Sequence, residues 1–428
     1  MCDLWEVFQV KRISIHAFPS LNNYGTGMMG LVTLSRLQRE IGEPVHFECD
    51  FFDRTNIDEV QDELGVSSDV ISLSRYKPRR KENPWSFRGR MKMLYHMMID
   101  SRVGGYDLVV FLGGDDLSEY YNPHIWIEML RLRKWTKEAP LVLLGQTIGP
   151  FQRPINRVAV RATLPKYHIF PRDHWCTSYL KSEFGLADSV VQSTDLAFAD
   201  LPRQHEESVA DEVLERYGLE REGYFTLIVS AIQANGYYTK DKDAYLKSWK
   251  GIVEDLLKSE RLTGKKLVLL AHTHTDYYGD ETKYIDALLP LIDPALRDRI
   301  VPVRERILQT RARFILGHGI FTITGRMHPA VSTFQMGKPA ISLSYSKKYE
   351  GVIGTMLGRS DLIIEANDPK LWESGEIVRL TLDKVRYVLD NQDRLRAEIR
   401  TAIDGQKQIV DDTFQRLGDL MQQNNPRR

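Results

Sequence analysis

The chain has 428 residues, of which 42% are hydrophobic, and it carries 58 basic and 58 acidic residues. This length exceeds that of one ordinary domain, and the composition is typical of two folded domains with sizeable cores. A net charge near zero excludes the attraction by the whole surface that draws proteins to nucleic acid, so any anion must be bound by a local cluster of charges.

Cysteine content and hydropathy indicate the compartment. Cys2, Cys49 and Cys176 are odd in number and widely spaced, which fits neither a disulfide framework nor a zinc site. The first residues lack an apolar run of signal-peptide length, and no segment reaches the roughly 20 apolar residues of a membrane span. We therefore expect a cytoplasmic protein and leave open a peripheral contact with the inner face of the membrane.

Short apolar segments alternate with helical patterns through the first half of the chain. Continuous apolar strands of this kind are typical of a parallel sheet that helices cover on both faces. The predicted strands are Arg12–Phe18, Val45–Phe51, Asp107–Leu112, Pro140–Ile148, Tyr167–Pro171 and Ser189–Gln192, and the main predicted helices are Thr26–Ile41, Trp85–Asp100 and Ile155–Leu164.

The alternation resumes after a charged, polar segment, residues 199–223, in which we place the domain boundary. We predict an α/β fold of two doubly wound, Rossmann-like domains, residues 1–203 and 204–428, that face a cleft. The second set of strands is Tyr224–Ser230, Lys266–Ala271, Ile300–Val303, Ile320–Ile323 and Pro339–Leu343, with helices at Asp243–Ser259, Glu281–Leu289, Met327–Met336 and, as an amphipathic tail, Thr381–Gln423.

The most informative stretch is Gly319–Lys347, where a buried strand gives way to a helix at Arg326 and His328. The next strand ends close to Lys347. Because ligands of open α/β sheets bind at the carboxyl ends of the strands, these cationic and proton-active side chains are expected to meet at one edge. The sequence therefore predicts an enzyme that binds and acts on an anion.

Two glycine-containing loops follow strands in the first half. The loop with Asn23 and Gly25 precedes a helix, so it can hold an anion on its backbone N–H groups, and a tight turn without a ligand is about equally expected. Asp115 and Asp116 follow a second strand. A helix cap or a contact with a hydroxyl of an acceptor is favoured for them over a metal site, since two adjacent aspartates have little specificity for metal.

Three further polar residues follow predicted strands. Arg172 can clamp an anion with two parallel hydrogen bonds, or can pair with an aspartate for structural reasons. Asp195 is interpreted as a structural hydrogen-bond acceptor, with a role as base or hydroxyl contact left open. His272 and His274 alternate on an extended segment as metal ligands would. No third ligand follows them, so a polar contact of His272 with a substrate is preferred to zinc.

The order and spacing of these motifs resemble the polysaccharide pyruvyl transferase family over most of the chain. The family is similar in fold to GT-B glycosyltransferases, and its members move pyruvate from phosphoenolpyruvate onto a sugar as a ketal. The resemblance rests on the loop at Asn23 and Gly25, the glycines Gly113 and Gly114, the segments Gly145–Pro150, Arg172–Ser178 and Asp195–Phe198, and the sequence from Arg326 through Gly337–Pro339 to Lys347.

The resemblance implies that Arg172 and Arg326, helped by Lys347, bind phosphoenolpyruvate and that His328 is the catalytic acid. It also implies that the first domain takes the acceptor, an oligosaccharide that can be lipid-linked, and the second domain takes phosphoenolpyruvate. No metal or cofactor is expected, and no nucleic acid. The chain departs from the family at Asp115–Asp116 and near Asn23, which concerns the acceptor side more than the phosphoenolpyruvate side.

Two other functions fit the same pattern. A GT-B glycosyltransferase would bind the diphosphate of a nucleotide-sugar with the same cationic residues. A carbohydrate-binding protein built on an inactive enzyme fold is disfavoured, because it has no use for the arginines, His328 and Lys347 together.

Overall fold

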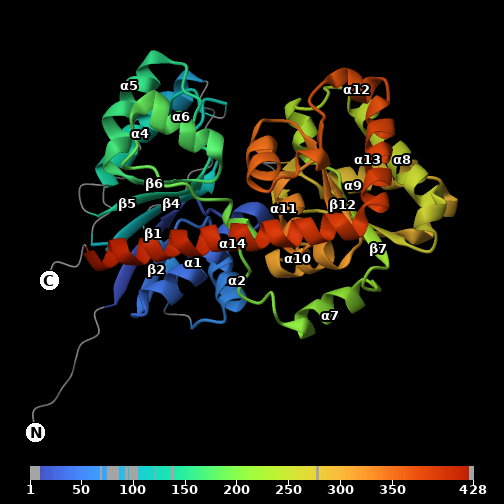
Figure 1. Ribbon diagram of the computed structural model, residues 1–428, viewed down its shortest axis with the longest axis horizontal. Helices are drawn as coiled ribbons and strands as arrows, with labels where there is room; N and C mark the ends of the chain where they lie inside the picture. Colours follow the sequence, from blue (N-terminus) through green and yellow to red (C-terminus); the bar gives the residue numbers. More distant parts are fainter. Residues whose placement is uncertain are drawn as a thin grey trace, which may run out of the picture. The chain divides into compact units, whose positions relative to one another are not determined.

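The computed structural model describes residues 10–67, 70–74, 86–91, 95, 105–120, 122–135, 139–275 and 279–423. These residues form two compact units (Figure 1). The first unit contains the chain up to Ser20, Met29–Leu196 and the C-terminal segment from Gln408, and the second contains Leu21–Met28 and Ala197–Lys407.

The first unit is built on a six-stranded parallel sheet with the order β3-β2-β1-β4-β5-β6. Figure 1 shows α4, α5 and α6 on one face of this sheet and α1 and α2 on the other. The strands are β1 (Lys11–His16), β2 (Val45–Cys49), β3 (Ile71–Leu73), β4 (Leu108–Gly114), β5 (Leu141–Gln146) and β6 (His168–Pro171), and the helices are α1 (Tyr24–Ile41), α2 (Thr55–Leu64), α4 (Ile125–Trp135), α5 (Pro154–Thr163) and α6 (His174–Phe184).

The central strands explain why this sheet is covered on both faces. All six residues of β5 are buried, and so are the first six of β4. Val109 and Leu143 belong to the core cluster that Met129 of α4 and Val160 of α5 complete. Both faces of these strands carry apolar side chains, so helices must cover each face to remove these side chains from water.

The second unit repeats this topology with the order β11-β8-β7-β12-β13-β14, again with parallel pairs. In both units the first strand lies beside the fourth, which creates a topological switch point between β1 and β4 and another between β7 and β12. The strands are β7 (Tyr224–Ile228), β8 (Lys266–Leu270), β11 (Ile300–Val303), β12 (Thr322–Thr324), β13 (Ala340–Ser344) and β14 (Ile363–Glu365), with a small hairpin of β9 (His274–Thr275) and β10 (Gly279–Asp280).

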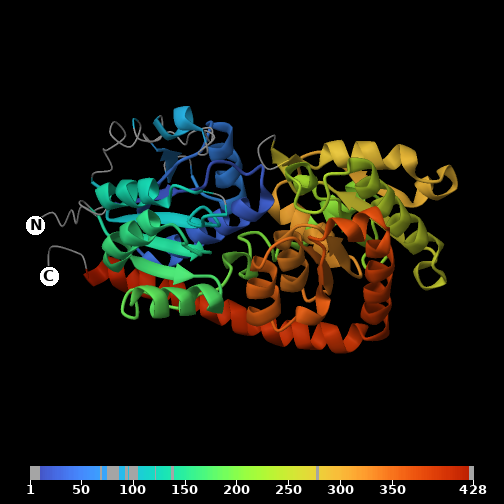
Figure 2. The same ribbon diagram turned by 90° about the horizontal axis from the view of Figure 1, so that it is seen from above.

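Helices connect these strands and continue to the C-terminus. Figure 2 shows α13 and the first part of α14, in red, along the border of the second unit. The helices of this part are α7 (Glu207–Arg216), α8 (Lys242–Lys258), α9 (Thr282–Leu288), α10 (Gln309–His318), α11 (Met327–Gln335), α12 (Pro369–Glu373), α13 (Glu376–Asp390) and α14 (Gln392–Gln423).

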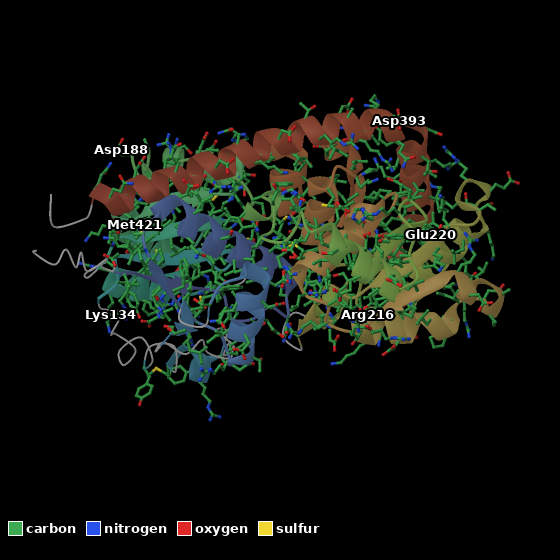
Figure 3. All side chains as sticks on the ribbon, turned by 90° about the horizontal axis from the view of Figure 1, so that it is seen from below. Lys134, Asp188, Arg216, Glu220, Asp393 and Met421 are labelled. Carbon is green, nitrogen blue, oxygen red and sulfur yellow. The ribbon has the colours of Figure 1, made fainter. Side chains whose placement is uncertain are left out.

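Helix α14 contributes to both cores. Leu395, Ile399 and Ile403 are buried in its first half, whose residues belong to the second unit. Val410 and Phe414 are buried in its second half, whose residues belong to the first unit. Figure 3 labels Asp393 and Met421 near its two ends. The buried residues recur at a spacing of three, four or seven residues, so the amphipathic pattern predicted for this tail is confirmed.

The structure confirms the predicted fold class of two doubly wound, Rossmann-like domains, and it corrects details. Ser189–Gln192 is not a strand, because only Val190 pairs, in an isolated bridge with Ile169. The predicted continuous tail helix is interrupted at Asn391, between α13 and α14. The predicted helix Trp85–Asp100 lies mostly outside the described residues. Within the described part of the chain, no helix combines the length and hydropathy that crossing a bilayer requires.

Candidate functional site

The polar residues selected from the sequence fall into two clusters, one in each unit. Arg326, His328, His272 and Lys347 lie in the second unit, together with the segment Leu21–Met28. Arg172, Asp115, Asp116 and Asp195 lie in the first. Nearly all follow the carboxyl ends of parallel strands, where an open α/β sheet binds its ligands.

The turn after β12 holds Arg326 in a fixed backbone arrangement. Thr324 Oγ1 accepts a hydrogen bond from Arg326 N at 2.9 Å, and the hydroxyls of Tyr238 and Tyr349 both donate to the carbonyl of Gly325, at 2.7 and 3.0 Å. A Cβ on Gly325 would stand 2.8 Å from the Cβ of Ser230. The turn therefore requires glycine, and the two tyrosines fix its direction.

Glu281, which the sequence analysis did not select, pairs with Arg326. Arg326 Nε donates to Glu281 Oε1 at 2.5 Å, and Glu281 Oε2 accepts from the backbone N–H groups of His272 at 2.8 Å and Thr273 at 3.1 Å. The Glu281 side chain is fully buried and that of Arg326 is 12% exposed. Burial raises the pKa of the Glu281 carboxyl, and Arg326 acts in the opposite direction.

His328 lies two residues after Arg326, at the start of α11, and is in contact with the segment that contains Asn23 and Gly25. Asn23 Oδ1 accepts from Gly25 N at 3.2 Å at the start of α1, and Tyr24 N donates to the carbonyl of His272 at 3.3 Å. A Cβ built on Gly25 would stand 2.2 Å from Nδ1 of His328. Gly25 thus permits the backbone of α1 to pack directly on the imidazole of His328.

His272 and His274, the two alternating histidines, lie after β8. No group of three or more potential metal ligands occurs among the described residues. His272 is 1% exposed, its ring meets that of Tyr24 edge-on, and its Nε2 has no hydrogen-bond partner in the described part of the chain. Burial lowers the pKa of His272 well below its ordinary value, and the neighbouring His328 and Arg326 lower it further. His274 Nε2 lies 3.2 Å from the hydroxyl of Tyr24.

Lys347 follows β13, the strand beside β12, and its side chain is exposed. The next residue, Lys348, places its ammonium group 4.9 Å from the centre of the Tyr345 ring. Parallel neighbouring strands end at the same edge of a sheet, so Lys347 belongs to the edge that carries Arg326.

In the first unit, Arg172 is enclosed by carboxylates. Its NH1 donates to Asp195 at 3.1 Å, its NH2 donates to Asp115, and its Nε donates to Thr147 Oγ1 at 2.8 Å. Arg172 is 1% exposed and Asp195 is fully buried, whereas the Asp115 side chain is 14% exposed. Asp173 caps α6 by accepting from Cys176 N at 2.8 Å. The structural pairing considered for Arg172 is therefore present, and its role as a ligand of phosphoenolpyruvate stays a prediction.

The glycines before Asp115 serve close packing. A Cβ on Gly113 would stand 2.4 Å from the carbonyl oxygen of Gly145, so β4 and β5 approach closely at this point. Asp115 and Asp116 follow at the carboxyl end of β4, and both are half-buried. This end of β4 lies at the switch point with β1, which suits a contact with the hydroxyl groups of a substrate.

Glu281 and Tyr24 could not be selected from the sequence for a physical reason. Glu281 precedes α9 within the segment Gly279–Thr282 and has the appearance of an ordinary acidic residue at a helix N-terminus. Its partners are the backbone of His272 and Thr273, which follow β8, and the side chain of Arg326, which follows β12 and lies 45 residues further along the chain. In the sequence Tyr24 likewise resembles an ordinary core residue. In the structure its hydroxyl accepts a hydrogen bond from Ile307 N at 2.9 Å.

Comparisons with known proteins identify the family of the chain. A family model described as polysaccharide pyruvyl transferase matches residues 23–347, which include both clusters. The chain is similar to the amylovoran biosynthesis protein AmsJ of Erwinia amylovora, with 22% identity over 354 residues that cover 76% of each protein.

Solved structures of similar fold include UDP-N-acetylglucosamine 2-epimerases. The enzyme from Neisseria meningitidis, bound to UDP-GlcNAc, gives a TM-score of 0.59 at 11% identity and covers 94% of this chain and 99% of its own. A putative epimerase from Listeria monocytogenes gives 0.59 at 13% identity, with 92% and 91% covered. At such identities the likeness establishes the GT-B-like fold and nothing about substrates.

Proposed function

We propose that this chain, which belongs to the polysaccharide pyruvyl transferase family, moves the pyruvyl group of phosphoenolpyruvate onto two hydroxyls of one sugar and releases phosphate. Membership of the family supports pyruvyl transfer in polysaccharide biosynthesis. We propose in addition that phosphoenolpyruvate is the donor and that the product is a ketal. The observation that carries it is the turn after β12, which lies inside the matched region and fixes Arg326 two residues before His328.

The proposed reaction balances without an oxidant or a metal. A proton adds to C3 of phosphoenolpyruvate, and the oxygen of the first sugar hydroxyl bonds to C2 and gives up its proton. The bond from C2 to the phosphate oxygen then breaks, and the second hydroxyl attacks C2 to close the ring. Its proton leaves with the phosphate. The enzyme must therefore supply an acid near C3, cations for the carboxylate and phosphate, and a surface for the sugar.

His328 is the proposed acid, and Arg326 and Lys347 are the proposed cations. General acid catalysis is typically worth about 10²- to 10⁴-fold in rate, and imidazole is suited to it because its ordinary pKa of about 6.5 lies near neutrality. His328 is half-buried and packed against Gly25, so its ring is held in place. Hydrogen bonds from charged groups contribute about 1.5 to 3 kcal/mol each, which favours arginine and lysine as ligands of the anion.

We assign the acceptor sugar to the first unit, at Asp115 and Asp116. Carboxylates accept hydrogen bonds from sugar hydroxyls. Arg172 is proposed here to hold Asp115 in position rather than to bind phosphoenolpyruvate, because Asp115 and Asp195 already neutralise its charge. Asp195 is fully buried, and its proposed role is to anchor Arg172.

The test is to incubate the purified protein with phosphoenolpyruvate and a panel of oligosaccharide acceptors, free and lipid-linked. We expect phosphate release that depends on the acceptor, and a product heavier by one pyruvyl ketal in mass spectrometry. A parallel panel of nucleotide-sugars serves as control. Glycosyl transfer from that panel, with no reaction of phosphoenolpyruvate, would replace this proposal by a glycosyltransferase.

A further inference from the structure

Glu281 is a buried carboxylate that joins three segments of the second unit. It lies at the start of α9, its Oε2 binds the backbone of His272 and Thr273 after β8, and its Oε1 binds Arg326 after β12. A single side chain thus ties the loop that carries His272 to the turn that carries Arg326.

The three contacts require a carboxylate rather than an amide. Arg326 Nε, His272 N and Thr273 N are all hydrogen-bond donors, and they approach both oxygens of Glu281. An ionised carboxylate accepts at both oxygens, whereas glutamine would turn its NH₂ group toward one set of donors. A glutamine of the same shape therefore keeps either the contact with Arg326 or the contacts with the backbone.

Stability alone does not explain this ion pair. The Glu281 side chain is fully buried, and removing a charge from water costs as much as the pairing returns, or more. An apolar pair of similar volume would serve the core equally well. The carboxylate also lies beside the arginine that we assign to an anion, where its charge opposes binding of that anion. The carboxylate instead fixes the orientation of the Arg326 guanidinium, because it accepts a hydrogen bond from its Nε.

We propose that Glu281 is a positioning residue, which fixes the guanidinium of Arg326 and the His272–Thr273 backbone in the one arrangement that receives phosphoenolpyruvate. This inference rests on the proposed function. The buried carboxylate of Glu281 opposes anion binding by its charge. It is nevertheless useful, because a guanidinium that is already oriented loses less conformational freedom when phosphoenolpyruvate binds.

The experiment measures binding of phosphoenolpyruvate by titration calorimetry, without acceptor, to the full chain and to Glu281→Gln. We expect the Kd to rise about 10- to 100-fold in Glu281→Gln, the size expected for loss of one charged hydrogen bond. If Glu281 were a counter-charge without a positioning role, removal of its negative charge would tighten binding. An equal or lower Kd in Glu281→Gln would therefore overturn the inference.

A second variant covers the case in which Glu281→Gln does not fold. Glu281→Asp keeps the charge but is shorter by one methylene, so it cannot reach both sets of donors at once, and we expect a Kd raised about three- to tenfold. A folded Glu281→Asp with the Kd of the unmodified protein would contradict the inference as well. Failure of the unmodified protein to bind phosphoenolpyruvate would refute the proposed function and this inference together.

Glu48 offers a matched control. It is 7% exposed and accepts from Arg12 NH2 at 2.6 Å and from the Tyr106 hydroxyl at 2.6 Å, in the first unit. Glu48→Gln removes a buried charge that also pairs with an arginine and a second donor. We expect it to change the melting temperature without changing the Kd for phosphoenolpyruvate. A rise in Kd equal to that of Glu281→Gln would show a general loss of stability and would overturn the positioning role.

Discussion

Replacement of Gly25 by alanine tests the placement of His328 without touching the histidine. A Cβ on Gly25 would stand 2.2 Å from Nδ1, 2.5 Å from Cγ and 2.8 Å from Cε1 of His328. Gly25 lies in the first turn of α1 and does not have a left-handed φ, so alanine fits its backbone. Alanine also has the higher helix propensity, by up to about 1 kcal/mol. The substitution therefore isolates one steric contact.

The expected magnitude follows from the overlap. Non-bonded carbon atoms rest about 3.5 to 4 Å apart, so the imidazole must move by more than about 1 Å to admit the methyl group. A misplacement of about 1 Å in a catalytic group can cost about 10²-fold in rate. We expect kcat of Gly25→Ala to fall about 100-fold, while the melting temperature changes by a few degrees at most.

The assay is phosphate release from phosphoenolpyruvate at saturating acceptor, with circular dichroism as a check of the fold. Gly27→Ala is the matched control on the same helix, because its Cβ would stand 2.1 Å from Nε2 of Gln309, a buried amide that donates to the carbonyl of Leu21 at 2.8 Å, and would displace this amide instead of the histidine. It should lose stability more than it loses kcat. A Gly25→Ala protein with normal kcat would refute the claim that contact with α1 sets the catalytic position of His328.

Three further outcomes are expected. His328→Ala should lower kcat by at least about 10²-fold with an unchanged circular dichroism spectrum, and normal transfer by the folded variant would exclude His328 as the acid. Arg172→Ala should lower the free energy of unfolding by about 3 to 5 kcal/mol in a urea titration, since Asp115 and Asp195 lose their cation. A raised KM without loss of stability would instead make Arg172 a ligand. Burial lowers the pKa of His16 to about 3, so its proton uptake on unfolding should cost stability as the pH falls from about 6.5 toward 3. Urea titrations of His16→Asn should show a weaker dependence on pH in that window, and an unchanged dependence would contradict the assignment.

Hydrophobic patterning predicted the fold well because the strands are buried on both faces. Ile300–Val303 was predicted with the bounds of β11, and β7, β8 and β13 were placed to within a few residues. Hydrophobic patterning missed the features of the fold that apolar spacing does not determine. The break at Asn391 is invisible because the apolar spacing continues on both sides of it, and the short edge strands β3 and β14 have three residues each, too few for a periodic signal.

The candidate site was predictable only in part, because sequence position indicates where a side chain emerges but not what it meets. Arg326 and His328 were selected from the strand that precedes them, and the structure places them at its carboxyl end. Glu281 was not, because its significance lies in three donors that come from other segments. Gly25 was selected as a loop residue, but its contact with His328 joins two distant parts of the chain and has no local signature.

The two arginines differ in a way that supports the proposed division of substrates. Arg172 is held between Asp115 and Asp195, and carboxylates accept hydrogen bonds from hydroxyl groups. Arg326 pairs with Glu281, and the exposed side chain of Lys347 adds a cation at the same edge of the sheet. An anion such as phosphoenolpyruvate is therefore favoured in the second unit, and an uncharged sugar in the first. The two similar sheets offer each proposed substrate a switch point, and the carboxylates around Arg172 and the exposed Lys347 near Arg326 support the proposed assignment of sugar to the first unit and phosphoenolpyruvate to the second.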